Sequence, residues 1–380
     1  MLDSDVVFLN HGSFGATPKP VFADYQAWQL RLERQPVYFI QHELWNHLAQ
    51  ARQQLGAFVR ANPDDLVFIP NATFGLNIVA RSLTLTPEDE VLTTDHEYGA
   101  CNNVWQFLSQ KQGFGYVQQP IDLPATTPEA IVEQLWQGVT PHTRIIYLSH
   151  ISSATALCFP IAEICYRARQ AGIMTIIDGA HAPGQLPLDL AAIDPDFYFG
   201  NLHKWLCSPK GSAFLYARAD RQPLIEPLVV GWGWGAGRTL SFGSDFLDYN
   251  QWLGTNDVSA YLAVPAAIQF QAVHDWTAVR QSCHALLTET IHRVCALTGL
   301  PSIYSNDSFY HQVATIPLPQ LAEAEVFKVA LLEEFKVEAP IVTWNGRHYI
   351  RISVQAYNTP DDIDILLEAL ATLLPKHTQK

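Results

Sequence analysis

The sequence predicts an α/β protein in which a large domain, built on a mostly parallel sheet, is followed by a smaller α+β domain. The chain has 380 residues, of which 48% are hydrophobic and 16% charged, so it can bury a large core. From about residue 67 to residue 218, short β-branched runs alternate with longer helical patterns, which indicates βαβ units. The pattern changes after a loop rich in Gly and Trp at residues 231–237. We therefore expect a large domain at residues 16–254 and a small domain at 255–380, with residues 1–15 packing near the ligand site.

The first region should contain six strands separated by helices. The expected strands are Leu66 to Pro70, Glu90 to Thr94, Arg144 to Ser149, Met174 to Asp178, Asp196 to Phe199 and Ser212 to Ala217. Between two of them, Pro160 opens a run with apolar residues on one face, and this run stops at Gly172. Proline at the start and glycine at the end are typical of a helix.

The C-terminal region mixes helices with a few strands. A long helical stretch is expected over residues 258–297, and the last helix over residues 360–374, where Asp361 and Asp362 suit the helix N-terminus. The other elements expected here are strands at 312–317, 337 and 349–354 and a helix at 322–335. A unit of roughly a hundred residues is an ordinary size for a domain.

Charge and cysteine usage exclude several classes of function. The chain carries 23 Lys plus Arg against 37 Asp plus Glu, a formal charge of −14, which argues against a nucleic-acid or anionic-membrane partner. Its six cysteines form no CxxC pair, so we expect reduced thiols in a cytoplasmic protein. The first residues lack the basic and apolar regions of an export signal, and no apolar run reaches about 18 residues. We therefore expect neither an export signal nor a membrane span.

Polar residues gather where the predicted strands end. In an open parallel sheet, ligands bind beyond the carboxyl ends of the strands. The segments that follow five of the strands are Asn71 to Gly75, Asp95 to Tyr98, His150 to Ser153, Asp178 to His181 and Gly200 to Trp205. Together they bring a carboxylate, several imidazoles, hydroxyls and a lysine to one edge of the sheet.

These residue types point to a particular chemistry. Lys204 is one of only eight lysines, and its neighbours Leu202 and Trp205 are apolar, which could depress its pKa and free the amine as nucleophile or base. Asp178, at the end of the neighbouring strand, is the partner that a pyridine nitrogen needs to stay protonated and act as an electron sink. Backbone N–H groups at the helix start in residues 71–75 would take a phosphate.

Each residue also has an ordinary structural explanation. Thr73 alone could be a helix cap, and a histidine at a strand end is more often structural than catalytic; only the joint placement favours a site. The histidines at positions 11, 96, 150, 181 and 203 lack the short same-face spacing of a zinc motif, so no metal is expected. No G-x-G-x-x-G follows a strand, which disfavours a dinucleotide.

At this point the sequence resembles the class V aminotransferase family of fold-type I enzymes, which use pyridoxal 5′-phosphate (PLP). The motifs that carry the resemblance are Asp178-Gly179-Ala180-His181, Asn201-Leu202-His203-Lys204, which places Lys204 26 residues after Asp178, and Ser208-Pro209-Lys210-Gly211. The motifs that are similar to its isopenicillin N epimerase-like branch are Asn10-His11-Gly12-Ser13-Phe14-Gly15, Asp95-His96-Glu97-Tyr98-Gly99-Ala100 and Leu202-His203-Lys204-Trp205. The resemblance runs from residue 8 to the C-terminal helix.

The resemblance implies roles for single residues. Lys204 would hold PLP covalently and later move the substrate proton, and Asp178 would pair with the pyridinium nitrogen. His181 would contact the ring hydroxyl, and His96 would stack on the ring, with Tyr98 as the alternative. The remaining cofactor-binding residues would be Ala72, Thr73, Asn201 and His203 at the phosphate, together with Phe74, with Ser153 where relatives often place Asn, and with Thr255.

The substrate side and the assembly are implied in the same way. Arg351 would bind the substrate carboxylate in a two-pronged manner, and Asn10 and His11 would be further substrate-binding residues. Thr255 would reach the phosphate of a neighbouring subunit, which implies a homodimer with composite sites.

The resemblance implies a PLP-dependent enzyme that acts at Cα of an amino acid, as an epimerase or racemase. A cysteine- or cystine-type C–S lyase and an aminotransferase are the alternatives. The last cysteine is Cys295, ahead of the small-domain loop that carries the nucleophile of related desulfurases, so persulfide formation is not expected. A catalytically silent binding protein of this fold is disfavoured by the intact Lys204, Asp178 and Arg351.

Two features stay open. The acid on the opposite face of the substrate could be His96, Tyr98 or His11. The aromatic loop with Trp232 and Trp234 could line the substrate entrance or pack at a domain or dimer contact.

Overall fold

A mostly parallel sheet forms the centre of the large domain in the computed structural model, which describes residues 1–378. Its strand order is β2-β8-β7-β6-β5-β3-β4, and β8 alone runs antiparallel to its two neighbours. The strands are β2 (Leu66–Ile69), β3 (Glu90–Thr94), β4 (Gly115–Gln119), β5 (Thr143–Ser149), β6 (Met174–Asp178), β7 (Phe197–Asn201) and β8 (Ala213–Ala217). All the residues of β2, β7 and β8 are buried, as expected for strands covered by helices on both faces.

The six predicted strands are confirmed. β3 and β6 have the predicted bounds, and the others differ at their ends by one or two residues. β4 is an additional strand at the edge of the sheet, and its residues are mostly half-buried. An edge strand rich in Gly and Gln lacks the apolar run by which a buried strand is recognised.

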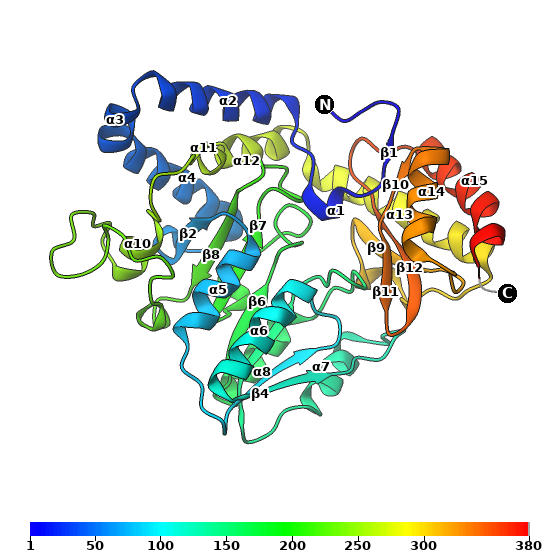
Figure 1. Cartoon of the computed structure of the whole chain (residues 1–380), viewed down its shortest axis with the longest axis horizontal. Helices are drawn as coiled ribbons and strands as arrows, with labels where there is room; N and C mark the ends of the chain where they lie inside the picture. The colour runs from blue at the N-terminus through cyan, green and yellow to red at the C-terminus, as the bar shows by residue number, and fades with distance from the viewer. Residues whose placement is uncertain (379–380) are drawn as a thin grey trace.

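Strand alternation divides the core between the two faces of the sheet. Ile145 and Tyr147 belong to one buried cluster, whereas Ile146 and Leu148 belong to the other, because successive side chains of a strand point to opposite faces. The helices of this domain are α5 (Ala72–Ser82), α6 (Gly99–Gln112), α7 (Pro128–Trp136), α8 (Ile161–Gln170), α9 (Leu190–Ile193) and α10 (Asp245–Asn250). In Figure 1, α5 and α6 lie side by side over the sheet.

A second, antiparallel sheet lies in the smaller C-terminal domain, at the right of Figure 1. Its order is β11-β12-β9. The elements of this domain are α13 (Trp276–Thr298), β9 (Val313–Pro317), α14 (Ala324–Phe335), β10 (Val337–Glu338), β11 (Ile341–Trp344), β12 (Arg347–Ser353) and α15 (Pro360–His377). Strand β1 (Val7–Phe8) pairs with β10, so the start of the chain is joined to this domain.

The prediction of one long helix over residues 258–297 is wrong. The region is helical but is divided into α11 (Ser259–Leu262), α12 (Val264–Val273) and α13. Asp275 has φ +43° and caps α13, which separates α13 from α12. Both α11 and α12 pack on the N-terminal helices α2 (Lys19–Arg34) and α4 (Leu44–Val59). The boundary at residue 254 stays a prediction.

The N-terminal helices were not predicted. They are α1 (His11–Phe14), α2 (Lys19–Arg34), α3 (Pro36–Tyr38) and α4 (Leu44–Val59), with a π-helical turn η1 (Phe39–Glu43) before α4. Short 3-10 turns are η2 (Pro63–Asp65), η3 (Gln222–Leu224) and η4 (Asp307–Phe309). Across residues 1–378, no helix is both long and apolar enough to cross a membrane.

Candidate active site

A cavity of about 340 Å³ opens where β5, β6 and β7 end. The residues of the predicted cofactor set that line it are Ala72, Thr73, Ser153, Asp178, His181, Asn201, His203 and Lys204. Ser13, Phe14 and Tyr98 also line it. The structure thus brings together residues from five separate loops of the large domain and from the N-terminal segment.

Lys204 lies in a hydrogen-bonded chain with His181 and Trp205. Its Nζ is 3.0 Å from His181 Nε2, and Trp205 Nε1 donates to His181 Nδ1 at 3.3 Å. An indole N–H can only donate, so the neutral imidazole carries its proton on Nε2 and donates to a neutral Lys204 amine. Burial, as the largest cause, and then the positive charge of Arg351 lower the pKa of Lys204 from 10.5 to about 7. The amine is therefore ready to act as nucleophile or base near neutral pH.

Asp178 lies at the end of β6 and is 4% exposed. Its Oδ1 accepts the backbone N–H of Ala180 at 2.8 Å, and its Oδ2 accepts the weaker contacts of Tyr147 OH at 3.3 Å and Cys101 Sγ at 3.5 Å. Burial raises the pKa of this carboxyl group. No cation of residues 1–378 forms an ion pair with Asp178, so a cationic N–H in the cavity would find an acceptor here.

Arg351 is a buried cation that forms no ion pair with a carboxylate of residues 1–378. It lies on β12, and its guanidinium donates to Ser153 O at 2.8 Å, to Ser153 Oγ at 3.0 Å and to Ser13 Oγ at 2.9 Å. Its Nε has no acceptor among residues 1–378. Burial lowers the pKa of Arg351 to about 10. Arg351 itself does not line the cavity, but both serines that it contacts do, so its guanidinium lies directly behind them.

The N-terminus of α5 forms the remaining wall. Asn71 caps the helix by accepting the Phe74 N–H at 2.9 Å, and Asn201 Oδ1 accepts the Ala72 N–H at 2.9 Å. Thr73, between them, lines the cavity. An anion is stabilised at such a helix start by the helix dipole and by N–H groups.

His96 and His11 lie outside the cavity, contrary to expectation. His96 is fully buried, with Nε2 2.9 Å from Ile121 O and Nδ1 2.7 Å from Thr155 Oγ1. Tyr98, two residues later, lines the cavity instead. His11 lies behind Lys204, because its Nε2 is 3.0 Å from the Lys204 carbonyl oxygen. It positions the lysine backbone from outside the cavity.

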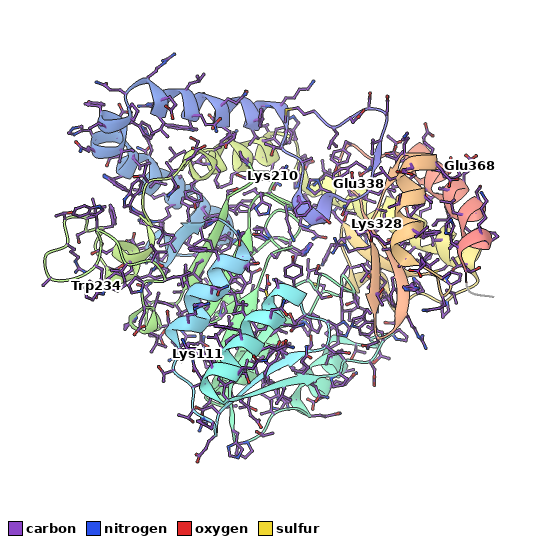
Figure 2. All side chains as sticks on the ribbon, in the orientation of Figure 1. Lys111, Lys210, Trp234, Lys328, Glu338 and Glu368 are labelled. Carbon is purple, nitrogen blue, oxygen red and sulfur yellow. The ribbon has the colours of Figure 1, made fainter. Side chains whose placement is uncertain are left out.

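Three further predicted residues do not line the cavity of their own chain. Asn10 donates to Glu338 Oε1 and accepts from Ser13. Phe74 packs against the core, and Thr255 is exposed on a turn. The aromatic loop lies at the outer end of the molecule, where Figure 2 shows Trp234, and neither Trp232 nor Trp234 lines the cavity of its own chain.

Two residues near the site were missed from the sequence. Glu97 is buried, and its carboxyl group accepts from Ser149 N at 2.9 Å, Ser149 Oγ at 2.6 Å and Thr94 Oγ1 at 2.7 Å. Burial raises its pKa to about 7. Ser13, the other missed residue, contacts Arg351. Neither residue carries a pattern of its own in the sequence, because Ser13 and Glu97 stand close to histidines and tyrosines that are the more usual catalytic types.

The chain is similar to several known proteins. The model of the family described as Aminotransferase class-V matches residues 16–366. An isopenicillin N epimerase of Amycolatopsis lactamdurans is 34% identical over 98% of this chain and 96% of its own length. A probable chloroplastic L-cysteine desulfhydrase of Arabidopsis thaliana is 26% identical over 98% of this chain and 84% of its own length. A cystine C–S lyase in complex with cysteine persulfide has the same fold, with a TM-score of 0.84 and 23% identity over 97% of this chain and 98% of its own.

Proposed function

Because the chain belongs to the aminotransferase class-V family, we propose that it is a PLP-dependent enzyme that inverts the configuration at Cα of an amino acid. One observation carries the choice of inversion. Lys204 and Tyr98 both line the cavity, and the strands that deliver them, β7 and β3, lie on opposite sides of β6, which ends in Asp178. We propose further that these two groups act on opposite faces of Cα, as an inversion requires.

The residues present fit the cofactor. Asp178 offers a buried carboxylate without a cationic partner in residues 1–378, which suits a pyridinium N–H. Thr73, Asn201 and His203 lie at the α5 helix start and the end of β7, where a phosphate would be held. Lys204 supplies the amine that binds the aldehyde. When bound, PLP supplies an electron sink for the charge that develops at Cα.

The chain's own residues then divide the work. Arg351 holds the substrate carboxylate, and Ser13 and Ser153 fix the guanidinium plane. Lys204 removes the proton from Cα on its side, since its neutral amine is kept ready by His181. Tyr98 delivers a proton to the other side. Return of the proton by Lys204 itself would restore the starting configuration.

The cofactor assignment is tested on the purified protein. We expect a visible absorbance band that Lys204→Ala abolishes, and a borohydride-trapped adduct located on Lys204. A colourless protein after incubation with PLP, with no lysine adduct, would refute the assignment. Lys111→Ala is the matched control, since Lys111 lies on α6 away from the cavity.

The reaction is tested by incubating holoenzyme with isopenicillin N and a panel of L-amino acids in deuterated buffer. Epimerisation predicts deuterium at Cα with loss of optical purity. Tyr98→Phe should keep the Cα exchange, which Lys204 performs, and lose the inversion by about 100-fold, a typical general-acid contribution. Equal loss of exchange and inversion in Tyr98→Phe would contradict the division of roles.

A C–S lyase is the second candidate, because a probable L-cysteine desulfhydrase is 26% identical to this chain. Pyruvate with sulfide from L-cysteine, or with persulfide from L-cystine, would identify this reaction, and a keto acid with retained side chain would identify a transaminase. Persulfide formation on the enzyme lacks a nucleophile, since no cysteine lines the cavity.

We also propose that the enzyme is a homodimer. The segment with Val230, Trp232 and Trp234 is exposed, at 66%, 67% and 55%, and an apolar surface of this kind is typical of an interface. Gly231 lies next to Trp252, close in sequence to the exposed Thr255, so a partner bound here would meet Thr255. Sedimentation should give a dimer that Trp232→Ser weakens, and a monomeric wild type would refute the proposal.

A further inference from the structure

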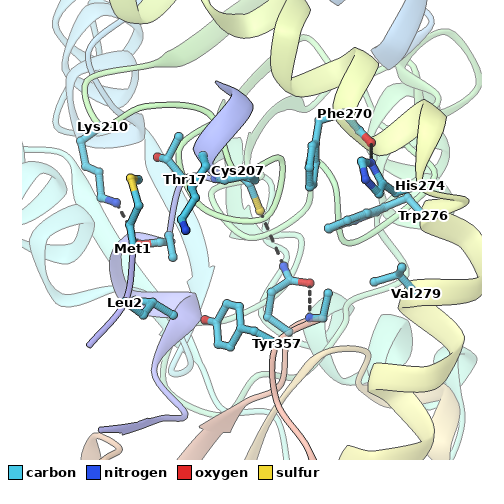
Figure 3. Close-up of a pocket in the computed structure, with 16 residues that line it drawn as sticks. Met1, Leu2, Thr17, Cys207, Lys210, Phe270, His274, Trp276, Val279 and Tyr357 are labelled. Atoms are coloured by element: carbon cyan, nitrogen blue, oxygen red, sulfur yellow. Dashed lines mark hydrogen bonds between the residues drawn. The ribbon is translucent and has the colours of Figure 1, made fainter. Parts of the chain in front are cut away.

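A second cavity, of about 650 Å³, is lined in part by Cys207 and Lys210 of the loop that also carries Lys204 (Figure 3). It is larger than the candidate active site. Its walls come from the connection between α1 and α2, from the loop after β7, from the α12–α13 junction and from the segment after β12. The cavity is thus built from both ends of the chain and from both domains.

One loop separates the two cavities. His203, Lys204 and Gly211 line the active-site cavity, whereas Cys207 and Lys210 line the second one. The polar groups between them are already paired with protein groups: His11 Nε2 contacts the Lys204 carbonyl oxygen, and the amide of Gln355 contacts His11 and Cys207. The second cavity is therefore a separate compartment.

The charge of this cavity is opposite to that of the chain. Its lining includes Lys19 and Lys210 and no Asp or Glu, although the chain has a net charge of −14 and only eight lysines. Lys210 Nζ donates to Gly15 O at 3.0 Å, and neither lysine forms an ion pair with a carboxylate of residues 1–378. Two of the three N–H donors of Lys210 are therefore available to an anion.

The wall facing Lys210 is aromatic. Figure 3 shows Phe270, His274 and Trp276 together on the side opposite Lys210. The Phe270 ring centroid is 4.3 Å from that of His274 and 5.8 Å from that of Trp276. Val279 completes this apolar side. Pockets of this volume, mostly apolar with one or two placed polar groups, are typical of small-molecule sites.

We propose that this second cavity binds an aromatic monocarboxylate, whose ring packs on Phe270 and Trp276 and whose carboxylate pairs with Lys210. The inference does not depend on the reaction at Lys204. The two features that carry it are two lysines that form no ion pair within residues 1–378, in a lining without Asp or Glu, and the aromatic wall across from Lys210. A ring stacked there gains apolar burial and favourable ring contacts, and the carboxylate gains a charge-assisted hydrogen bond.

The test is calorimetric titration of the PLP-loaded wild-type protein with 3-phenylpropionate, and with its neutral amide. We expect one site per chain for the acid, and affinity at least about ten-fold weaker for the amide and for Lys210→Met, from the loss of the charge-assisted bond. Val279→Trp, which fills the cavity without touching Lys210, should also weaken binding. Lys111→Met, on the surface of α6, should leave it unchanged.

Several results would overturn the proposal. One is absence of binding at millimolar 3-phenylpropionate, and another is equal affinity for the acid and the amide. A third is binding that survives both Lys210→Met and Val279→Trp but is lost in Arg351→Ala, since the carboxylate would then occupy the active-site cavity.

Discussion

Trp205→Phe tests the origin of the neutral Lys204 amine. The substitution keeps an aromatic ring at a fully buried position and removes the only hydrogen-bond donor that His181 Nδ1 has among residues 1–378. His181 can then carry its proton on Nδ1, and its Nε2 becomes an acceptor for a protonated Lys204. The variant should therefore favour the ammonium form, and the pKa of Lys204 should rise above about 7.

The size of the shift follows from the bond that is lost. A neutral hydrogen bond contributes about 1 kcal/mol net, and one pKa unit corresponds to about 1.4 kcal/mol. The N–N distance of 3.3 Å is slightly longer than that of an ordinary hydrogen bond, so the pKa of Lys204 should rise by at most about 0.7 unit.

The assay mixes apoprotein with PLP and records the rate at which the visible band appears between pH 5.5 and 9. Only the unprotonated amine attacks the aldehyde, so the midpoint of the rate profile reports the pKa of Lys204. Trp276→Phe is the matched control, because Trp276 is buried and its Nε1 has no acceptor among residues 1–378. An unchanged midpoint in a folded Trp205→Phe, or the same shift in Trp276→Phe, would refute the reasoning.

Three further predictions concern the charged groups. Relative to the wild type, Glu97→Gln should gain about 2–3 kcal/mol of unfolding free energy as the pH rises from 5 to 8. The folded pKa of Glu97, about 7, lies above its ordinary value of 4.5, so the wild type loses stability as pH rises through this window. A pH-independent difference in urea unfolding would contradict this. Arg351→Lys should keep the visible band and lose about 100-fold in kcat/KM, since one ammonium cannot replace the two-pronged contact; a loss below about five-fold would count against the clamp. In the apoprotein, Lys204→Met should be more stable than the wild type, and this difference in unfolding free energy should be about 2 kcal/mol larger at pH 7 than at pH 9. The folded pKa of Lys204 is lowered from 10.5, so protonation of the unfolded chain destabilises the wild type as pH falls. Equal differences at the two pH values in denaturant unfolding would show that the amine is not buried in its neutral form.

The central sheet could be predicted because its strands are buried apolar runs between turn residues. The N-terminal helices were missed: Val21, Trp28 and Leu32 lie on one face of α2 and pack on the core, but only Val21 is buried. The position of α2 depends on packing against α11 and α12. The same reason applies to β4, whose place at the sheet edge leaves its side chains half-buried.

The sequence predicted which strand ends carry the site residues. It did not predict which side chains at those ends face the cavity. Asp178 and Lys204 line the cavity because both directly follow or end a parallel strand. In the loop after β3, His96 turns inward to Ile121 and Tyr98 turns to the cavity. Two residues so close in sequence have the same polar character, and only the packing decides which one faces the ligand.

The antiparallel strand β8 has a consequence for how the chain folds. Within residues 1–378, β2 pairs only with β8, although β8 begins at Ala213, long after β2 ends at Ile69. During synthesis the fully apolar Leu-Val-Phe-Ile segment of β2 therefore has no strand to pair with until most of the large domain has been synthesised. Pairings between distant segments form slowly, and an exposed apolar strand is prone to aggregate while it waits. The yield of folded protein should thus depend on chaperone capacity more than on the final stability.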